Sequence, residues 1–202
     1  MSTNTDLEAL RRPQIIQAAL LVISQLGIAN VTMDDIARSA GLSKGGVAHY
    51  FSGKDALCKE AFREFFARIF QRSRDTMDAC DGPLEKLLSF GWLYNWEDPD
   101  VNLGYPLLFD CMALASRDAE YRRLFHDWVD SWIAMLRESV MEGLRLGMFA
   151  GIEPDGAART ISSIYHGVAV RWYLDRDSHT SAWAVDACKR SIAGLLGVNV
   201  RP

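Results

Sequence analysis

The stretch TMDDIARSAGLSKGGVAHYFSGK, residues 32–54, predicts two short helices joined by a tight turn. Thr32 belongs to the residue types that cap helix N-termini, because its hydroxyl accepts a hydrogen bond from a backbone N–H of the first turn. Gly41 is expected to end the first helix, since glycine adopts the left-handed conformation there without steric cost. Ser43 offers a second N-cap, so a second helix is expected over residues 44–50.

This arrangement has the geometry of a helix-turn-helix, in which two helices flank a turn of three or four residues. Five apolar side chains are expected to lie buried beneath the motif: Ile36, Ala37 and Ala40 on the first helix, and Val47 and Phe51 on or just after the second. The second helix of such a motif enters the major groove of DNA. The stretch therefore predicts a DNA-binding protein.

The same residues resemble the TetR family of transcriptional regulators, over about residues 10–60. The positions that carry the resemblance are Thr32, Ile36, Ala37, Ala40, Gly41, Leu42, Ser43, Gly45, Tyr50, Phe51, Lys54 and Leu57. The run His49–Phe51 and the aromatic-rich remainder of the chain are similar to the branch of that family that contains the choline-responsive repressor BetI. The resemblance implies an all-α fold with an N-terminal DNA-binding domain and a C-terminal ligand-binding and dimerisation domain.

The exposed face of the second helix supplies candidate contacts to DNA. Lys44 can reach a guanine or a phosphate, and His49 can donate to a base edge or a phosphate. Gly45 and Gly46 either let the backbone approach DNA closely or relieve crowding at the helix start. The resemblance implies that Thr32, Tyr50 and Lys54 contact phosphates. The predicted DNA-binding residues are Thr32, Ser43, Lys44, Gly45, Gly46, His49, Tyr50 and Lys54.

The charge balance indicates that DNA affinity comes from placed contacts and from a dimer. The 202 residues carry a net charge of −4, and residues 1–60 hold six basic and six acidic side chains. A DNA-binding end without net positive charge excludes affinity from bulk charge. Arg11 and Arg12, at the start of the first helix, are either contacts to the DNA backbone or minor groove, or an ordinary exposed basic pair.

Helical periodicity and turn residues predict an all-α chain, because no segment shows sustained strand-like alternation. Nine helices are expected, over residues 10–26, 33–40, 44–50, 54–80, 83–96, 103–115, 119–146, 154–174 and 181–196. Residues 1–55 are expected to form the helix-turn-helix DNA-binding domain, and residues 56–202 the helical ligand-binding and dimerisation domain.

All six tryptophans lie after residue 90. Trp92 and Trp96 have i, i+4 spacing, so they are expected to share a helix face. One aromatic at such a spacing is more often core than ligand contact. Together, with carboxylates nearby in the sequence, the aromatics suit a cavity for an organic cation, although a neutral aromatic or acyl ligand stays open. The predicted ligand-binding residues are Trp92, Trp96, Tyr105, Phe109, Asp110, Trp128, Trp132, Tyr165, His166 and Trp172.

The sequence predicts no catalytic residue, cofactor or metal ion, and hence no enzyme. Its four histidines lack a metal-binding spacing, and the sequence contains no G-x-S-x-G, Walker or dinucleotide-binding motif. Four scattered cysteines favour reduced thiols. A polar N-terminus and the lack of an apolar run near ~18 residues predict a cytoplasmic protein without a membrane partner.

One helix-turn-helix contacts few base pairs, so a homodimer on a palindromic operator is expected, with half-sites about 34–36 Å apart. The resemblance implies that residues 154–174 and 181–196 pair at the dimer interface. The predicted function is a ligand-responsive repressor that a small molecule releases from double-stranded DNA. Two alternatives stay open: a DNA-binding protein of the same fold without an effector, and a small-molecule-binding module that has lost its DNA function.

Overall fold

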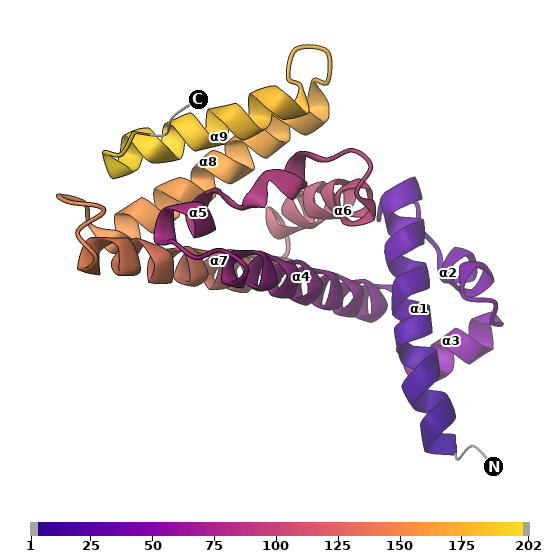
Figure 1. Ribbon diagram of the computed structural model, residues 1–202. Coiled ribbons are helices and arrows are strands. Elements are labelled where there is room, and N and C mark those ends of the chain that lie inside the picture. The colour runs from indigo at the N-terminus through magenta and orange to yellow at the C-terminus, as the bar shows by residue number, and fades with distance from the viewer. Residues whose placement is uncertain (1–3, 200–202) are drawn as a thin grey trace. The chain divides into compact units, whose positions relative to one another are not determined.

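The computed structural model describes the backbone of residues 4–199 and the side chains of residues 10–199. Regular secondary structure in this part of the chain is entirely helical, which confirms the all-α prediction (Figure 1). The α-helices described are α1 Asn4–Leu26, α2 Met33–Ser39, α3 Lys44–Tyr50, α4 Lys54–Asp78, α5 Pro83–Leu88, α6 Pro99–Ala115, α7 Ala119–Arg145, α8 Pro154–Leu174 and α9 Ser181–Leu196, and a short 3-10 helix, η1, spans Phe90–Tyr94.

The chain forms two compact units. The first unit contains the chain up to Arg68 together with Asn102–His126, and the second contains Ile69–Val101 together with the chain from Asp127 onward. Helices α4, α6 and α7 each contribute residues to both units. The functional boundary expected near residue 55 stays a prediction. None of the described helices combines the length and the apolar character that crossing a membrane requires.

Side-chain caps fix the two helices of the motif, as predicted. The Thr32 hydroxyl accepts a hydrogen bond from Asp35 N–H at 3.2 Å, and the Asp35 carboxylate accepts one from Thr32 N–H at 3.0 Å. This reciprocal capping box holds the start of α2 and keeps the pKa of Asp35 below its usual value. Gly41 follows α2 with a φ of 66°, in the left-handed region. Ser43 caps α3 by accepting from Gly46 N–H at 3.0 Å.

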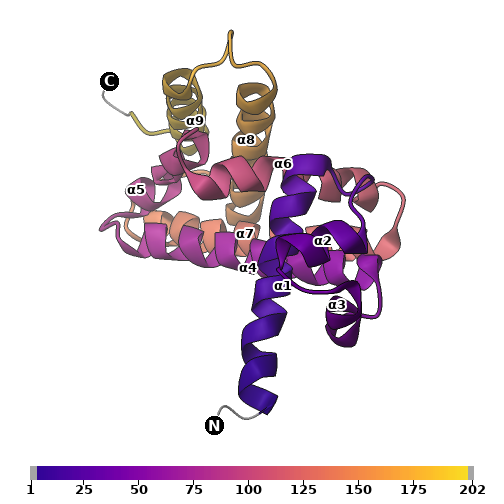
Figure 2. The ribbon, with the colours of Figure 1, turned by 90° about the vertical axis from the view of Figure 1, so that its right-hand side faces the viewer.

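Helix α2 packs against both α1 and α3 (Figure 2). The face of α1 toward this packing is fully buried at Ile15, Ala19 and Ile23. Gln14 on α1 donates to the carbonyl of Ala40 at 2.8 Å, which satisfies an acceptor at the end of α2 that the helix itself leaves unpaired. Helix α1 begins at Asn4 rather than at residue 10. The prediction missed these first turns, because their polar sequence shows no apolar periodicity.

The prediction of one helix over residues 83–96 is wrong, since the structure divides this segment into α5 and η1. The α-helix ends where Ser89 donates from both its N–H and its hydroxyl to the carbonyl of Lys86. The tighter 3-10 turns then bury Phe90 and Tyr94, at 0% and 1% exposure, against α8 and α9. Tertiary packing overrides the local preference here, so residues 92 and 96 do not share a helix face.

Helices α8 and α9 match their predicted ranges and pack against each other (Figures 1 and 2). Glu153 caps α8 and Thr180 caps α9, each through a side-chain oxygen that accepts a backbone N–H. Gly197 ends α9 with a φ of 67°. Helix α6 begins at Pro99, earlier than predicted, because Asp98 caps it by accepting from Asp100 N–H at 2.9 Å.

Candidate nucleic-acid interface and effector site

Helix α3 has one buried face and one exposed face. Val47 and Phe51 are 0% and 5% exposed, as the sequence predicts. The opposite face presents the predicted contacts Lys44, Gly45 and His49 to solvent. The arrangement leaves the reading surface of the helix open while the motif beneath it is held by apolar packing.

The other predicted DNA contacts surround this exposed face. Thr32 and Ser43 are exposed at the starts of α2 and α3, and Tyr50, Lys54 and Gly46 are half-buried. The hydroxyls of Thr32 and Ser43 already accept backbone hydrogen bonds as helix caps. The Thr32 N–H and hydroxyl also donate to the Asp35 carboxylate, so what the start of α2 offers to a phosphate is the positive end of the helix.

Lys44 lies 2.9 Å from the carboxylate of Asp34, and both side chains are more than half exposed. An exposed ion pair of this kind contributes little to stability, so a DNA phosphate can compete for the lysine. The His49 ring packs edge-on against the Tyr50 ring at 5.2 Å between centroids. This contact orients two neighbouring side chains on the candidate interface.

The two glycines of α3 differ in what surrounds them. A Cβ placed on Gly45 would approach only Ser43 Oγ, at 4.0 Å, which is ordinary contact distance. A Cβ on Gly46 would lie 3.3 Å from the same oxygen, which caps the helix. Relief of crowding therefore explains Gly46 within the protein, whereas nothing in the packing of α3 requires glycine at position 45.

Arg12 joins three helices of the first unit. Its guanidinium donates to the carbonyl of Tyr50 at 3.4 Å, pairs with Glu60 at 3.2 Å and lies 4.6 Å from the centre of the Phe51 ring. Arg12 therefore holds the C-terminal end of α3 in contact with α1 and α4. The sequence did not reveal this role, because its partners are distant in the chain and only the fold brings them together.

The predicted ligand-binding residues do not all fall in one unit. Tyr105, Phe109 and Asp110 belong to the first unit, where the two rings lie 6.2 Å apart. Asp110 accepts a hydrogen bond from Ile28 N–H at 2.7 Å, so this carboxylate anchors the connection after α1. The remaining seven predicted residues belong to the second unit: Trp92, Trp96, Trp128, Trp132, Tyr165, His166 and Trp172.

Four of these seven gather with Phe90, which the prediction did not include, and we call the five the aromatic cluster: Phe90, Trp128, Trp132, Tyr165 and His166. The Trp132 ring lies 4.8 Å from Phe90, 5.7 Å from Tyr165 and 6.1 Å from His166 between ring centroids. Trp128 packs edge-on against His166 at 5.7 Å. The cluster joins η1, α7 and α8 within the second unit.

The aromatic cluster contains few polar atoms, and one of them lacks a hydrogen-bond partner within the part of the chain that the structure describes. The Tyr165 hydroxyl donates to the carbonyl of Leu87 at 2.8 Å, and burial raises its pKa. His166 Nδ1 lies 2.8 Å from the carbonyl of Ser162, so this nitrogen carries the proton, and burial lowers the pKa of the ring. The indole N–H of Trp132 is buried and makes no hydrogen bond within the part of the chain that the structure describes.

Two other predicted tryptophans already hold cations of the chain itself. Arg72 lies with its guanidinium carbon 3.9 Å from the Trp92 ring centre and pairs with Asp98 and Asp100. These pairs lower the pKa of Asp98. An aromatic face with carboxylates beside it is the arrangement that proteins use to bind organic cations.

The second such stack lies after the end of α8. The Arg176 guanidinium carbon is 3.5 Å from the Trp96 ring centre, and Trp96 stacks on Trp172 at 3.9 Å. The two arginines were missed in the sequence, because no local pattern links them to the tryptophans they cover.

Among the described residues, no three His, Cys, Asp or Glu side chains gather in a way that could hold a metal ion. The four cysteines form no disulfide with one another.

Two family models match the chain. Residues 15–61 match the model described as bacterial regulatory proteins, tetR family. Residues 105–197 match the model described as BetI-type transcriptional repressor, C-terminal.

Several known proteins are similar to this chain. The transcriptional repressor KstR2 of Mycobacterium tuberculosis is 34% identical over 174 residues, which cover 81% of each chain. The regulator BetI of Stenotrophomonas maltophilia is 38% identical over 98 residues, which span 47% of this chain and 48% of the relative. These relatives are named as regulators and repressors, in agreement with the prediction that the chain is not an enzyme.

A transcriptional regulator of Saccharomonospora viridis, solved in complex with choline, superposes with a TM-score of 0.80 at 20% identity, over 95% of this chain and 97% of that one. At this identity the likeness shows a shared fold. The exposed face of α3, the two matching models and the KstR2 relative lead to one conclusion: the chain belongs to the TetR family of DNA-binding transcriptional regulators, and residues 105–197 match the C-terminal model of BetI-type repressors.

Proposed function

We propose that this regulator is a repressor that binds a palindromic operator as a homodimer and releases it when a small molecule binds the second unit. The observation that carries the proposal is the division of α3 into a buried and an exposed face. Val47 fixes the helix in the motif, while Lys44, Gly45 and His49 are exposed and available to the major groove.

The outward faces of α8 and α9 support a dimer through these helices. Gly156, Thr160, Ser163 and Gly167 recur at helical spacing along α8 and are all exposed. A Cβ on Gly167 or on Gly194 of α9 would meet nothing within 4 Å. Small side chains on a helix surface allow a second helix to approach closely. Ile161, Ile192 and Leu196 are buried inside the chain, whereas Ile164, Val168 and Leu195 are half-buried, so the proposed interface combines small residues with these partly exposed apolar side chains.

The effector that we favour is an organic cation. The choline complex of the Saccharomonospora viridis regulator supports this class, and so do the guanidinium groups that already lie on Trp92 and Trp96. In the aromatic cluster, the buried N–H of Trp132 is a donor that an oxygen atom of the ligand would satisfy. A cation that also carries a hydroxyl or carbonyl oxygen fits both features.

Release follows from a shift between two populations of the dimer. An effector lowers DNA affinity only to the extent that it binds the DNA-incompetent arrangement more tightly. Coupling free energies between such sites are about 1–3 kcal/mol, so one effector is expected to weaken operator binding by roughly 5- to 150-fold.

Selection of bound duplexes from a random pool, followed by titration with choline and with indole, tests the proposal. The expected result is an inverted repeat whose complex choline dissociates and indole does not, with a change in tryptophan fluorescence on choline binding. Release by indole alone would overturn the cation class. A selected repeat that neither compound nor any related cation releases would favour a DNA-binding protein without an effector, and failure to select any DNA at low salt would overturn the repressor.

A further inference from the structure

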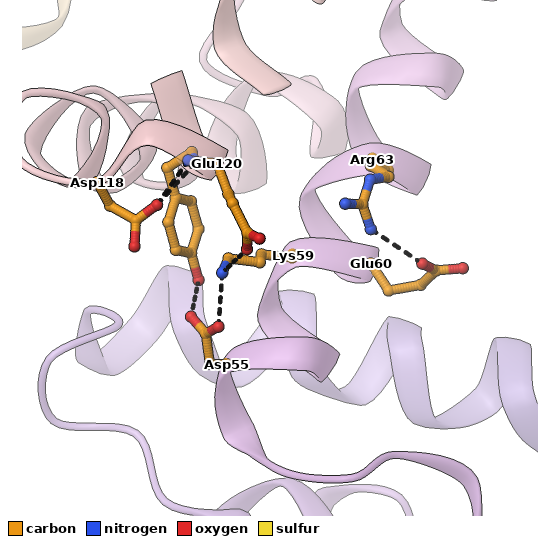
Figure 3. A network of polar contacts seen from close by, with 7 residues as sticks. Asp55, Lys59, Glu60, Arg63, Asp118 and Glu120 are labelled. Carbon is orange, nitrogen blue, oxygen red and sulfur yellow. Dashed lines mark hydrogen bonds and ion pairs between the residues drawn. The ribbon is translucent and has the colours of Figure 1, made fainter. Parts of the chain in front are cut away.

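A polar network joins the first two turns of α4 to the first turn of α7, both within the first unit (Figure 3). Its members are Asp55 and Lys59 on α4 and Glu120 and Tyr121 on α7, and we call these four residues the α4–α7 joint. Lys59 is only 9% exposed, although it is charged. An enclosed lysine is retained only where its charge is paired, so the network is a specific feature of this surface.

The contacts of the joint close around the Lys59 ammonium. Lys59 Nζ donates to the Asp55 carboxylate at 2.6 Å and also to the Glu120 carboxylate. The Tyr121 hydroxyl donates to the other oxygen of Asp55 at 3.1 Å, and the ammonium lies 5.1 Å from the Tyr121 ring centre. The Lys59 ammonium and the Asp55 carboxylate, both on α4, therefore each hydrogen-bond to a side chain of α7.

The carboxylates of the joint lie at the N-terminal ends of two helices, where negative charge is stabilising. Asp118 caps α7 by accepting from Glu120 N–H at 2.7 Å and from Tyr121 N–H at 3.2 Å. Asp55 and Glu120 lie in the first turns of their helices, where negative charge is favourable. Hydrogen bonds to Asp55 and Glu120 raise the pKa of Lys59, and burial raises that of Tyr121, so both groups keep their protons at neutral pH.

The two helices of the joint also carry a candidate DNA contact and residues of the aromatic cluster. Lys54, a predicted phosphate contact, is the first residue of α4 and immediately precedes Asp55. On the other side, α7 continues without a break to Arg145 and carries Trp128 and Trp132 of the aromatic cluster. One helix thus bears both the joint and the aromatic residues.

We propose that Lys59 is a positioning residue for DNA binding, and that the α4–α7 joint is where α7 sets the placement of the α4 N-terminus. The inference rests on the proposed function. If the start of α4 moved away from the start of α7, Lys59 would have to separate from Glu120. The enclosed charge of Lys59 makes that separation unfavourable. The first turn of α4, with Lys54 and the preceding Tyr50, therefore follows the start of α7. An effector that displaces α7 would move these contacts together.

Substitution of Glu120 alone leaves Lys59 paired with Asp55, so the loss of folding stability is expected to be small. The side chains of Asp55 and Glu120 are 67% and 57% exposed, and ion pairs to exposed carboxylates add little to folding. Glu120→Gln keeps the shape of the side chain and removes its charge, so the fold is expected to survive while the link between the helices weakens.

The experiment compares operator binding by the full-length wild type, Glu120→Gln and Tyr121→Phe across a range of salt concentrations, on a duplex that the wild type selects from a random pool. Glu142→Gln is the matched control, since Glu142 pairs with Lys86 on α5 at 3.0 Å in the second unit. We expect Glu120→Gln to weaken binding about tenfold, within the usual range of coupling between sites, with an unchanged salt slope and melting temperature.

The salt slope separates positioning from direct contact, because removal of one phosphate contact reduces the slope by about 1. Wild-type affinity in both Glu120→Gln and Tyr121→Phe would overturn the inference, and so would an equal loss of affinity in Glu142→Gln. A reduced slope in Glu120→Gln would also overturn it, because the joint would then belong to the contact surface. If the wild type selects no DNA, the proposed function fails first and the inference with it.

Discussion

Gly45 offers a test in which stability and DNA binding are expected to change in opposite directions. Replacing it with alanine adds a Cβ whose nearest neighbour, Ser43 Oγ, is 4.0 Å away, so the protein accommodates the methyl group without strain. Alanine in place of glycine inside a helix gains about 0.5–1 kcal/mol. Since Gly45 lies in the first turn of the seven-residue α3, we place the gain at the lower end of that range.

Gly45→Ala is expected to raise the melting temperature by about 1–2 °C, from the usual scaling for a chain of this size. It is expected to lower the operator affinity at least tenfold. A tenfold decrease corresponds to about 1.4 kcal/mol, the amount by which a methyl group would obstruct close approach of the α3 backbone to DNA. The assays are thermal unfolding by circular dichroism and fluorescence anisotropy with a labelled operator.

Gly46→Ala is the matched comparison, because its Cβ would lie 3.3 Å from the hydroxyl that caps the helix. That variant is expected to gain less stability than Gly45→Ala. The reasoning is refuted if Gly45→Ala binds the operator as tightly as the wild type does, since glycine at position 45 would then have no role in approaching DNA.

Three further changes test other parts of the account. Lys54→Ala should weaken binding about equally for all DNA sequences and reduce the salt slope by about 1, and an unchanged slope would remove Lys54 from the phosphate contacts. Gly143→Ala should destabilise the chain by about 1–3 kcal/mol in urea unfolding, because its Cβ would lie 2.0 Å from the ring of the buried Phe149; wild-type stability would contradict this packing. Arg72 lowers the pKa of Asp98, so this pair stabilises the fold above the ordinary carboxyl pKa, about 4, and the contribution disappears as the pH falls through the lowered value. Asp98→Asn should therefore melt below the wild type at pH 7 and approach it in acid, whereas a constant difference down to pH 3 would refute the assignment.

The parts of the fold that sequence predicts well are those set by local chemistry. Thr32 and Ser43 cap helices as expected, because a cap depends on a hydroxyl and on backbone groups within a few residues. Gly41 adopts the expected left-handed conformation for the same local reason. The exposed and buried faces of α3 follow from helical periodicity alone, so its buried side could be predicted residue by residue.

The parts that the sequence did not predict depend on partners far along the chain. The break between α5 and η1 follows from the burial of Phe90 against α7 and α8, which no local pattern encodes. The contact of Arg12 with Tyr50 and the stack of Arg72 on Trp92 likewise join residues that only the fold brings together. For this reason the local structure of the helix-turn-helix was predicted more fully than the packing of the aromatic residues.

In the proposed complex, two copies of α3 read the two halves of one operator. The most direct measurement is the mass and the affinity of the complex between the full chain and a selected duplex, compared with the same duplex after one half-site is scrambled. We expect two chains on the intact duplex and an affinity at least 100-fold lower on the scrambled one, since each mismatched base pair costs about 1–3 kcal/mol. A single bound chain, or equal affinity for both duplexes, would contradict it.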